Sequence, residues 1–234
     1  MTDITKSQDS SFAIDQLGAS VRRQVEQRIR QAIIEGHIRP GDHLSDRALT
    51  AKLNVSRPLV REAVRQLEAE GLVEVIPHKG AFVKKLSVEE ISDIYDVRGV
   101  LEALAARLFA RNASEDQIAR LCRSFDKIKK NAESMCTGSV LDLKQEFYSI
   151  LSEGAHNDYV RTMLNQILNR ITQLRATTLS DPDRLPRTVE ELQALIDAIV
   201  ARDETAAWEA SLHHVKMAAR QALNIIAQGQ SLGQ

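Results

Sequence analysis

Three arginines with helical spacing are the first sign of chemistry in this chain. Arg57, Arg61 and Arg65 recur every four residues, so on a helix they lie along one edge. A guanidinium can bond O6 and N7 of guanine as a fork, or hold a phosphate in the same way. A solvated helix with Arg–Glu pairs is the alternative, because glutamates are interspersed. The elements around the arginines must decide between these interpretations.

Two short helices joined by a tight turn are expected around these arginines. Ser45 can cap a first helix, which Asn54 can end in the left-handed conformation. Ser56 can cap a second helix, and Pro58 is tolerated in its first turn. The second helix also has an apolar stripe at i, i+4 and i+7, formed by Val60, Val64 and Leu67.

A small β-hairpin is predicted after the second helix. Gly71 can end that helix, and residues 72–76 and 81–85 have the composition of two short strands. The turn between them contains His78, Lys79 and Gly80, so its tip is basic and can reach a phosphate or a minor groove. A solvated turn lysine is the alternative. With an amphipathic helix expected over 19–35, these elements predict a winged helix-turn-helix: three helices and a hairpin.

The charge distribution favours nucleic acid as the partner of this segment. The 234-residue chain has a formal net charge of −1, which alone gives no such indication. Residues 20–85, however, hold 13 Lys and Arg against 8 Asp and Glu, a net of +5. The remaining C-terminal residues hold 17 against 21, a net of −4. Positive charge is therefore gathered where the helix-turn-helix is predicted.

This segment resembles the N-terminal domain of GntR-type bacterial transcription regulators. The string GHIRPGDHLSDRALTAKLNVSRPLVREAVRQLEAEGLVEVIPHKGAFV carries the resemblance. It implies that Arg47, Arg57 and Arg61 contact double-stranded operator DNA and that the hydroxyl of Ser56 contacts a phosphate. We therefore expect a DNA-binding surface made of Arg47, Ser56, Arg57, Arg61, Arg65, His78, Lys79 and Gly80.

Three positions depart from the GntR pattern. Asn54 stands where Gly is usual, and Lys79 replaces a common Gly in the wing. Pro58 stands where Thr is frequent, which weakens any phosphate contact assigned to that position.

The chain after Lys85 has helical patterns only and predicts an antiparallel all-α bundle. Ser87 and Glu90 form a capping box at its start, and Gly138, Pro182 and Pro186 are expected to separate helices. The expected helices cover residues 87–111, 114–133, 140–153, 158–178, 187–201 and 204–227. The domains are thus a flexible tail over 1–18, the winged domain over 19–85 and the bundle over 86–230.

The bundle resembles the FCD ligand-binding domain, which follows the winged domain in one GntR subfamily. The segments that carry the resemblance are YDVRGVLEALAARLFA, QEFYSILSEGAHNDYV, ELQALIDAIVARDETAAWEAS and LHHV. Many FCD domains hold a metal with one Asp and three His. At those positions this chain has Lys144, Tyr148, Leu192 and His214, so we expect no metal. A shifted register could instead recruit one of three nearby residues, Asp142, His156 and His213.

Four residues are candidates for binding an effector instead. Arg98 interrupts an apolar stripe, so its charge needs a partner, either Glu102 four residues on or a ligand carboxylate; we favour the ligand. Lys144 shares a helix face with Tyr148 and can hold an anion, or it can lie along the bundle surface. His214 can bond a ligand or be a satisfied core histidine. Weaker candidates are Arg175 and Trp208.

Together these observations predict a dimeric transcription regulator that binds a palindromic operator. We expect it to act as a repressor. A small organic-acid or sugar-acid effector in the bundle would modulate it. One rival is a DNA-binding dimer with a vestigial pocket, and another is a helical-bundle enzyme with an accessory winged domain.

The sequence favours a cytoplasmic protein. The N-terminal stretch MTDITKSQDSS has no apolar run typical of a secretory signal, and no segment suits a membrane, so we expect the cytoplasm, with Cys122 and Cys136 reduced.

Overall fold

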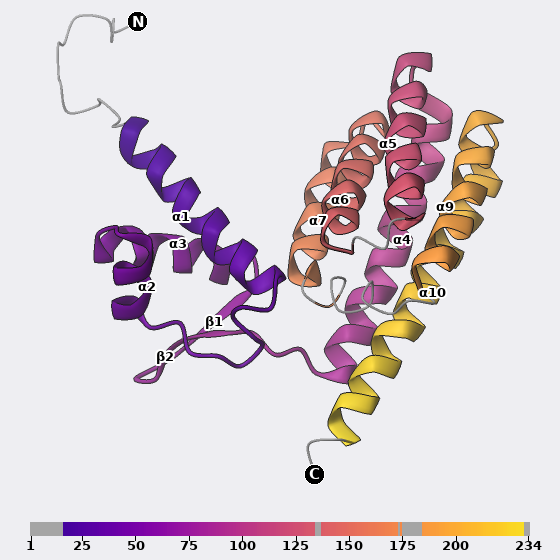
Figure 1. Ribbon diagram of the computed structural model, residues 1–234. Helices are drawn as coiled ribbons and strands as arrows, with labels where there is room; N and C mark the ends of the chain where they lie inside the picture. Colours follow the sequence, from indigo (N-terminus) through magenta and orange to yellow (C-terminus); the bar gives the residue numbers. More distant parts are fainter. Residues whose placement is uncertain (1–15, 134–136, 173, 175–183, 232–234) are drawn as a thin grey trace, which may run out of the picture.

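The chain folds into two helical domains of different size, which are joined through the segment that follows the hairpin (Figure 1). A computed structural model describes residues 16–133, 137–172, 174 and 184–231. As expected, the architecture is mainly helical with one two-stranded antiparallel sheet among the described residues. Its elements are α1 (Gln16–Ile34), α2 (Asp46–Leu53), α3 (Arg57–Ala69), β1 (Val73–Ile76), β2 (Gly80–Val83), α4 (Val88–Asn112), α5 (Glu115–Glu133), α6 (Thr137–Gly154), α7 (Asp158–Arg170), α9 (Arg184–Val200) and α10 (Glu204–Ser231).

The helix-turn-helix forms as its capping residues predict. Ser45 accepts a hydrogen bond from the Ala48 N–H at 3.4 Å, and Asn54 ends α2 in the left-handed conformation with φ 52°. Ser56 begins α3 in an extended conformation, with Pro58 in the first turn. A compact core between α1, α3 and the hairpin fixes the orientation of α3, and it includes Ile29, Ile33, Val60, Val64 and Leu67.

The wing is a short antiparallel pair whose register is Val73 with Val83, Glu74 with Phe82, Val75 with Ala81 and Ile76 with Gly80. The turn at its tip is closed by a hydrogen bond from the Lys79 N–H to the Ile76 carbonyl at 3.0 Å. His43, which precedes α2, adds an isolated bridge to Phe82. The loop before α2 is therefore tied to the base of the wing.

The helical domain is built around α4, which contacts α6, α7, α9 and α10. The capping box predicted at its start is formed, since Ser87 and Glu90 exchange side-chain and backbone hydrogen bonds. Its core is separate from that of the winged domain and holds large buried side chains such as Phe109, Leu121, Phe147 and Leu164. This domain buries several charged residues next to that core.

Three predicted boundaries are wrong. Helix α6 begins at Thr137, so Gly138 lies within its first turn, where a glycine is tolerated. Helix α7 ends at Arg170 and not at residue 178, because Ile171 leaves the helical conformation with φ −102° and ψ 8°. The Thr172 hydroxyl donates to the Leu168 carbonyl at 2.7 Å beside this end. Pro186 lies in the first turn of α9, where its missing N–H costs no helical bond.

The predicted flexible tail over 1–18 is wrong at residues 16–18, which belong to α1, and its residues 1–15 lie outside the described residues, as does the predicted break at Pro182. Among the described helices, none is both long enough and apolar enough to cross a membrane.

Candidate functional site

The first candidate site is a hollow where α2, α3 and the wing meet. It has a volume of about 330 Å³, and the predicted residues Arg47, Arg57, Arg61 and Gly80 all line it. They come from three separate elements, so the fold brings together residues that lie up to 33 positions apart in the sequence. An open, cationic hollow of this kind suits a phosphate or the edge of a base.

Arg61 is paired with a carboxylate of its own domain. Its Nε lies 2.7 Å from Oδ2 of Asp46, at the start of α2. No described carboxylate forms an ion pair with Arg57 or Arg65, both of which are exposed. The Arg–Glu pairing within α3 that was the alternative for this helix is therefore not what the described residues show.

The other predicted DNA-binding residues are exposed around the hollow without lining it. Ser56 makes no side-chain capping bond to a described residue, so its hydroxyl faces outward from the start of α3. Arg65 lies one turn beyond Arg61, and the wing tip presents Lys79 and His78, the latter with φ 63°. Their contacts with DNA stay predictions.

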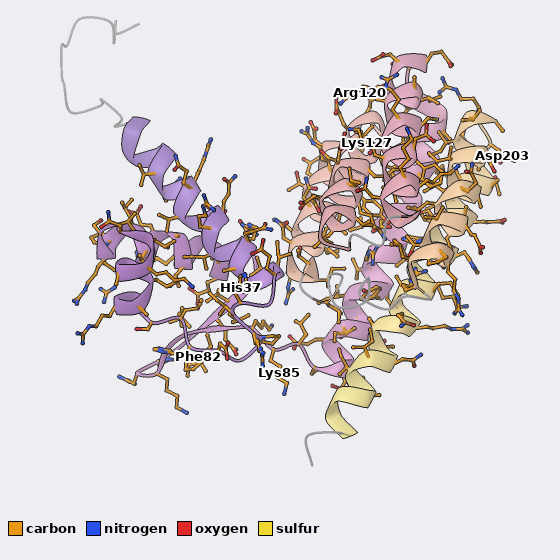
Figure 2. The ribbon with its side chains drawn as sticks, viewed as in Figure 1. His37, Phe82, Lys85, Arg120, Lys127 and Asp203 are labelled. Carbon is orange, nitrogen blue, oxygen red and sulfur yellow. The ribbon has the colours of Figure 1, made fainter. Side chains whose placement is uncertain are left out.

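His43 is a residue of this site that the sequence did not reveal. Its ring lies 5.0 Å from the Phe82 ring, centroid to centroid, and Figure 2 places Phe82 in the wing. A Cβ on Gly80 would lie 2.7 Å from the His43 Nε2, and Gly80 also has φ +99°. Glycine at this position is therefore needed twice, for its backbone conformation and for the close approach of His43. Only the folded loop brings these residues together.

The second candidate site is a cluster of charged side chains buried in the helical domain. Arg98 of α4 is 1% exposed, and its Nε lies 2.6 Å from Oε1 of Glu102. Burial alone would lower the pKa of Arg98, but the adjacent Glu102 carboxylate raises it above its ordinary value, so the guanidinium stays charged. The guanidinium also lies 5.1 Å from the centre of the Tyr95 ring. The Glu102 pair, expected as the alternative, is thus formed, and a ligand contact of Arg98 stays a prediction.

His214 of α10 and Glu191 of α9 form the middle of this cluster. Nδ1 of His214 lies 2.6 Å from Oε2 of Glu191, which also accepts two 2.8 Å bonds from Arg184 as a fork. Burial, followed by the charge of Lys144, lowers the pKa of His214 to about 4. Burial raises the pKa of Glu191, but the hydrogen bonds from His214 and Arg184 outweigh it and bring that pKa to about 2. At pH 7, a neutral imidazole therefore donates from Nδ1 to a carboxylate.

Lys144 and Tyr148 lie on the α6 side of the same cluster. Both are buried, with Lys144 5% exposed, so the alternative that Lys144 lies along the bundle surface is wrong. The charge of Lys144 acts on His214, and the Tyr148 ring centre lies 6.0 Å from the Arg98 guanidinium. All four predicted effector-binding residues therefore come together in the core.

Three residues of the cluster on α9 were missed from the sequence. Arg184, Thr188 and Glu191 fall at i, i+4 and i+7, and this polar stripe on one helix face was a readable signal. The FCD resemblance points to Leu192, which is fully buried and apolar, whereas its neighbour Glu191 contacts His214. Several polar atoms here are buried without a hydrogen-bond partner among the described residues: Oε2 of Glu102, Oγ1 of Thr188 and Nε2 of His214.

The donor set of the cluster does not fit the metal site that the FCD resemblance implies. Within the described ranges, no three His, Cys, Asp or Glu side chains come together in a way that could hold a metal ion. Lys144 brings a positive charge close to His214, which opposes a divalent cation there. A shifted register does not repair the site, because the three alternative residues are exposed: Asp142, His156 and His213.

Trp208 is the one weaker candidate that the described residues include. Trp208 is half-buried, and the guanidinium carbon of Arg107 lies 4.5 Å from the centre of the Trp208 ring. Arg175 and Cys136 lie outside the described residues. Cys122 is a free thiol whose pKa is raised by partial burial and by Asp126, so it is protonated at neutral pH.

Comparison with known proteins identifies both domains. Residues 93–217 match the FCD domain family, and residues 21–83 match the family described as bacterial regulatory proteins, gntR family. A solved structure of a putative GntR transcriptional regulator from Rhodococcus sp. RHA1 superposes with a TM-score of 0.75 at 24% identity, covering 88% of this chain and 98% of the other. That likeness shows that the fold is shared.

Curated relatives agree with the two domain matches. The transcriptional repressor RspR of Escherichia coli K12 is 25% identical over 84% of this chain and 86% of its own. The repressor GlaR of the same organism is 28% identical over 80% of this chain and 89% of its own. These are transcription regulators, so the enzyme hypothesis is wrong. The chain belongs to the GntR family of DNA-binding bacterial transcription regulators, among those that carry an FCD domain.

Proposed function

We propose that this regulator is a dimeric repressor that leaves a palindromic operator when a small organic monoanion enters the buried cluster of the FCD domain. Each subunit of a two-fold dimer would read one half-site with the hollow around Arg47, Arg57 and Arg61. Both readers must fit at once, so a small change in their separation weakens binding. The effector only has to favour one placement of the readers over the other.

The charge of the buried cluster carries this proposal. It contains three cationic side chains, Arg98, Lys144 and Arg184, and two carboxylates, Glu102 and Glu191, with His214 neutral. These cations lie together in the core, where a carboxylate bound beside them would be held by charge as well as by hydrogen bonds. A ligand with one carboxylate suits a cluster that already contains Glu102 and Glu191, because each further negative charge would lie close to theirs.

The hydrogen-bonding atoms of the cluster further restrict the ligand. Oε2 of Glu102 and Nε2 of His214 are buried acceptors that lack a donor among the described residues. The Thr188 hydroxyl is buried nearby on α9 without a described partner. Hydroxyl groups on the ligand would satisfy all three, so a hydroxylated monocarboxylate such as a small sugar acid suits the site best.

The same residues favour a metal-independent site. Metal-binding FCD domains use an Asp and several His residues as ligands, and here Lys144 stands at the position of the Asp and its ammonium charge acts on His214. A carboxylate can bind this ammonium directly.

An exposed apolar surface supports the dimer. Val97 and Val100 of α4 are exposed, and the exposed Leu212 of α10 lies over Gly99 between them. An antiparallel crossing of two α4 helices at Val100 would place Asp93 of each copy opposite Arg107 of the other, because both lie seven residues from Val100. The surface is thus self-complementary in charge as well as apolar.

Sedimentation of the Val100→Asp variant tests the dimer. Val100 and Met163 are matched in exposure, at 53% and 50%, but Met163 lies on α7. We expect Val100→Asp to yield monomers and Met163→Asp to leave dimers. Equal behaviour of the two variants would contradict this assignment.

Thermal unfolding with a panel of sodium salts tests the effector: lactate, gluconate, galacturonate, malate and citrate. A ligand of the folded state raises the unfolding midpoint with concentration, by an amount set by its dissociation constant. We expect a hydroxylated monocarboxylate to raise it more than malate or citrate, in buffer containing a chelator. A vestigial pocket would give no shift with any salt while DNA binding remains intact.

A further inference from the structure

The helical domain touches the winged domain directly behind the recognition helix α3. Arg170, the last residue of α7, lies against Gly71 in the turn between α3 and β1. Figure 1 shows the two domains approaching where α1 and α7 end, and Ile34 at the end of α1 packs on the core of the helical domain. The contact is therefore formed by side chains from the ends of both helices.

Gly71 is shaped to receive the arginine. A Cβ at this position would lie 2.8 Å from Nε, 3.1 Å from Cδ and 3.2 Å from Cγ of Arg170. Any other residue would have to displace the arginine, and the φ of +75° disfavours most side chains as well. The Nε of Arg170 is buried and has no hydrogen-bond partner among the described residues. A buried donor without a partner costs free energy, so a contribution to the stability of the fold does not explain why Arg170 is placed here.

Ion pairs on either side of Arg170 tie the same turn to its surroundings. Lys84, just after β2, lies 2.7 Å from Glu90 in the first turn of α4. The Arg170 charge acts on Glu90 as well, although the hydrogen bonds from Lys84 and Ser87 contribute more to the lowered pKa of Glu90. Within the winged domain, Arg30 of α1 holds Glu70 at the end of α3 at 2.6 Å. The end of the recognition helix is thus fixed from both domains.

Helix α7 also packs on two of the helices that carry the buried cluster. These are α4, which carries Arg98, and α6, which carries Lys144. One helix of 13 residues therefore packs on the helices of the cluster and ends at the turn behind α3.

We propose that Arg170 is a positioning residue that holds the reader at a fixed orientation on the helical domain and passes movements of α7 to the recognition helix. The contact stands on its own geometry, whereas the signal that it transmits rests on the proposed function. The tests below separate the two.

Hydrogen exchange of the full-length protein without ligand or DNA tests the contact. We expect Arg170→Ala to speed exchange of the amides in 68–73 and 84–91 by about fivefold or more, because the domains separate more often. Arg161→Ala is the control, since Arg161 is exposed on the same helix and pairs with Asp158 there. Unchanged exchange in Arg170→Ala would overturn the contact, whether or not the protein responds to an effector.

A double-mutant cycle tests the pairing of Arg170 with Gly71. Asn tolerates positive φ, so Gly71→Asn isolates the steric displacement of the arginine. We expect the fall in unfolding midpoint caused by Gly71→Asn to be smaller in the Arg170→Ala background by half or more. Additive effects would show that the two residues are not coupled.

Binding to palindromes of altered spacing tests the positioning role. The probe is a duplex selected in vitro by the wild-type protein, together with versions whose half-sites are one base pair closer or farther apart. Wild type should lose affinity by about tenfold with each altered spacer, and Arg170→Ala should lose about threefold or less, because its readers are no longer fixed. Equal spacer dependence in both proteins would contradict a positioning role. A wild-type protein indifferent to spacing would reject the proposed dimeric mode of reading while leaving the exchange result intact.

Discussion

The two charged regions of this regulator use the same residue types in opposite ways. The reader surface keeps Arg47, Arg57 and Arg65 in water without described carboxylate partners, ready for an external polyanion. The cluster in the helical domain buries Arg98 and Arg184 and pairs each with a carboxylate from its own chain. Exposed cations are therefore available to an external anion, whereas buried cations need a partner inside the protein.

The exposed and the buried ion pairs also contribute differently to the free energy of unfolding. The exposed Arg61–Asp46 pair is solvated and contributes on the order of 1 kcal/mol or less. Removing one member of a buried pair costs several times more, because the remaining charge is left without a partner. The comparison leads to four predictions of decreasing effect.

The largest effect is expected from Glu191→Ala. This substitution leaves Arg184 and His214 buried without their shared carboxylate, so unfolding in urea should show a loss of about 3 to 5 kcal/mol. Glu153→Ala, which removes an exposed partner of Arg120, should cost about 1 kcal/mol or less. Similar losses in both variants would mean that the buried pair is no more important than a surface pair.

The second effect is a loss of stability in acid. The folded pKa of His214 is about 4, and an unfolded histidine has a pKa of about 6.5. Between these values the unfolded chain binds a proton that the folded chain does not, so stability falls by about 3 kcal/mol as pH drops through this window. Glu191, with its folded pKa of about 2, extends the loss below pH 4.

Urea unfolding at several pH values measures this dependence. The groups that face His214 are Lys144 from α6, Glu191 from α9 and Glu102 from α4. His214→Asn should flatten the profile between pH 6.5 and pH 4, and the control His213→Asn should not, because His213 is exposed. A flat wild-type profile would show that His214 is not buried in neutral form.

The third effect concerns recognition and not stability. Arg61→Ala should lose about 1 to 3 kcal/mol of discrimination at one base pair if Arg61 reads guanine. Competition binding with single-base variants of a selected duplex measures it. A uniform loss across all variants would instead identify Arg61 as a phosphate contact.

The smallest effect is expected in the wing. In Gly80→Ala the new Cβ lies on a residue with positive φ and comes close to His43, whereas in Gly41→Ala it lies on a residue with positive φ but enters open space. Gly80→Ala should therefore cost about 1 kcal/mol more in unfolding free energy than Gly41→Ala. In the His43→Ala background this difference should vanish, and its persistence would exclude His43 as the cause.

The reader could be predicted in detail because its signals are local. Ser45, Asn54 and the stripe through Val60 act within a few residues, so caps and turns specify the fold. His43 and Asp46 were missed because their partners are distant in sequence: His43 meets Gly80 only after the wing has folded, and Asp46 meets Arg61 only after α2 has packed on α3.

The buried cluster was predicted in part. Arg98 and Lys144 stand out as charges within apolar stripes, and the structure buries both. Glu191 and Arg184 were missed because the FCD resemblance puts Leu192 at a metal-ligand position, one residue away from the side chain that contacts His214. A single-residue shift turns a helix by about 100°, so it exchanges a core position for a polar one.

The most direct test of the account is release of a selected DNA duplex by organic acids, followed by fluorescence anisotropy in buffer containing a chelator. We expect a hydroxylated monocarboxylate to release DNA from the wild-type protein, and to fail with Lys144→Met, which still binds the duplex. Release that needs added zinc, or that is equal in the two proteins, would contradict a metal-independent site built on the buried charge.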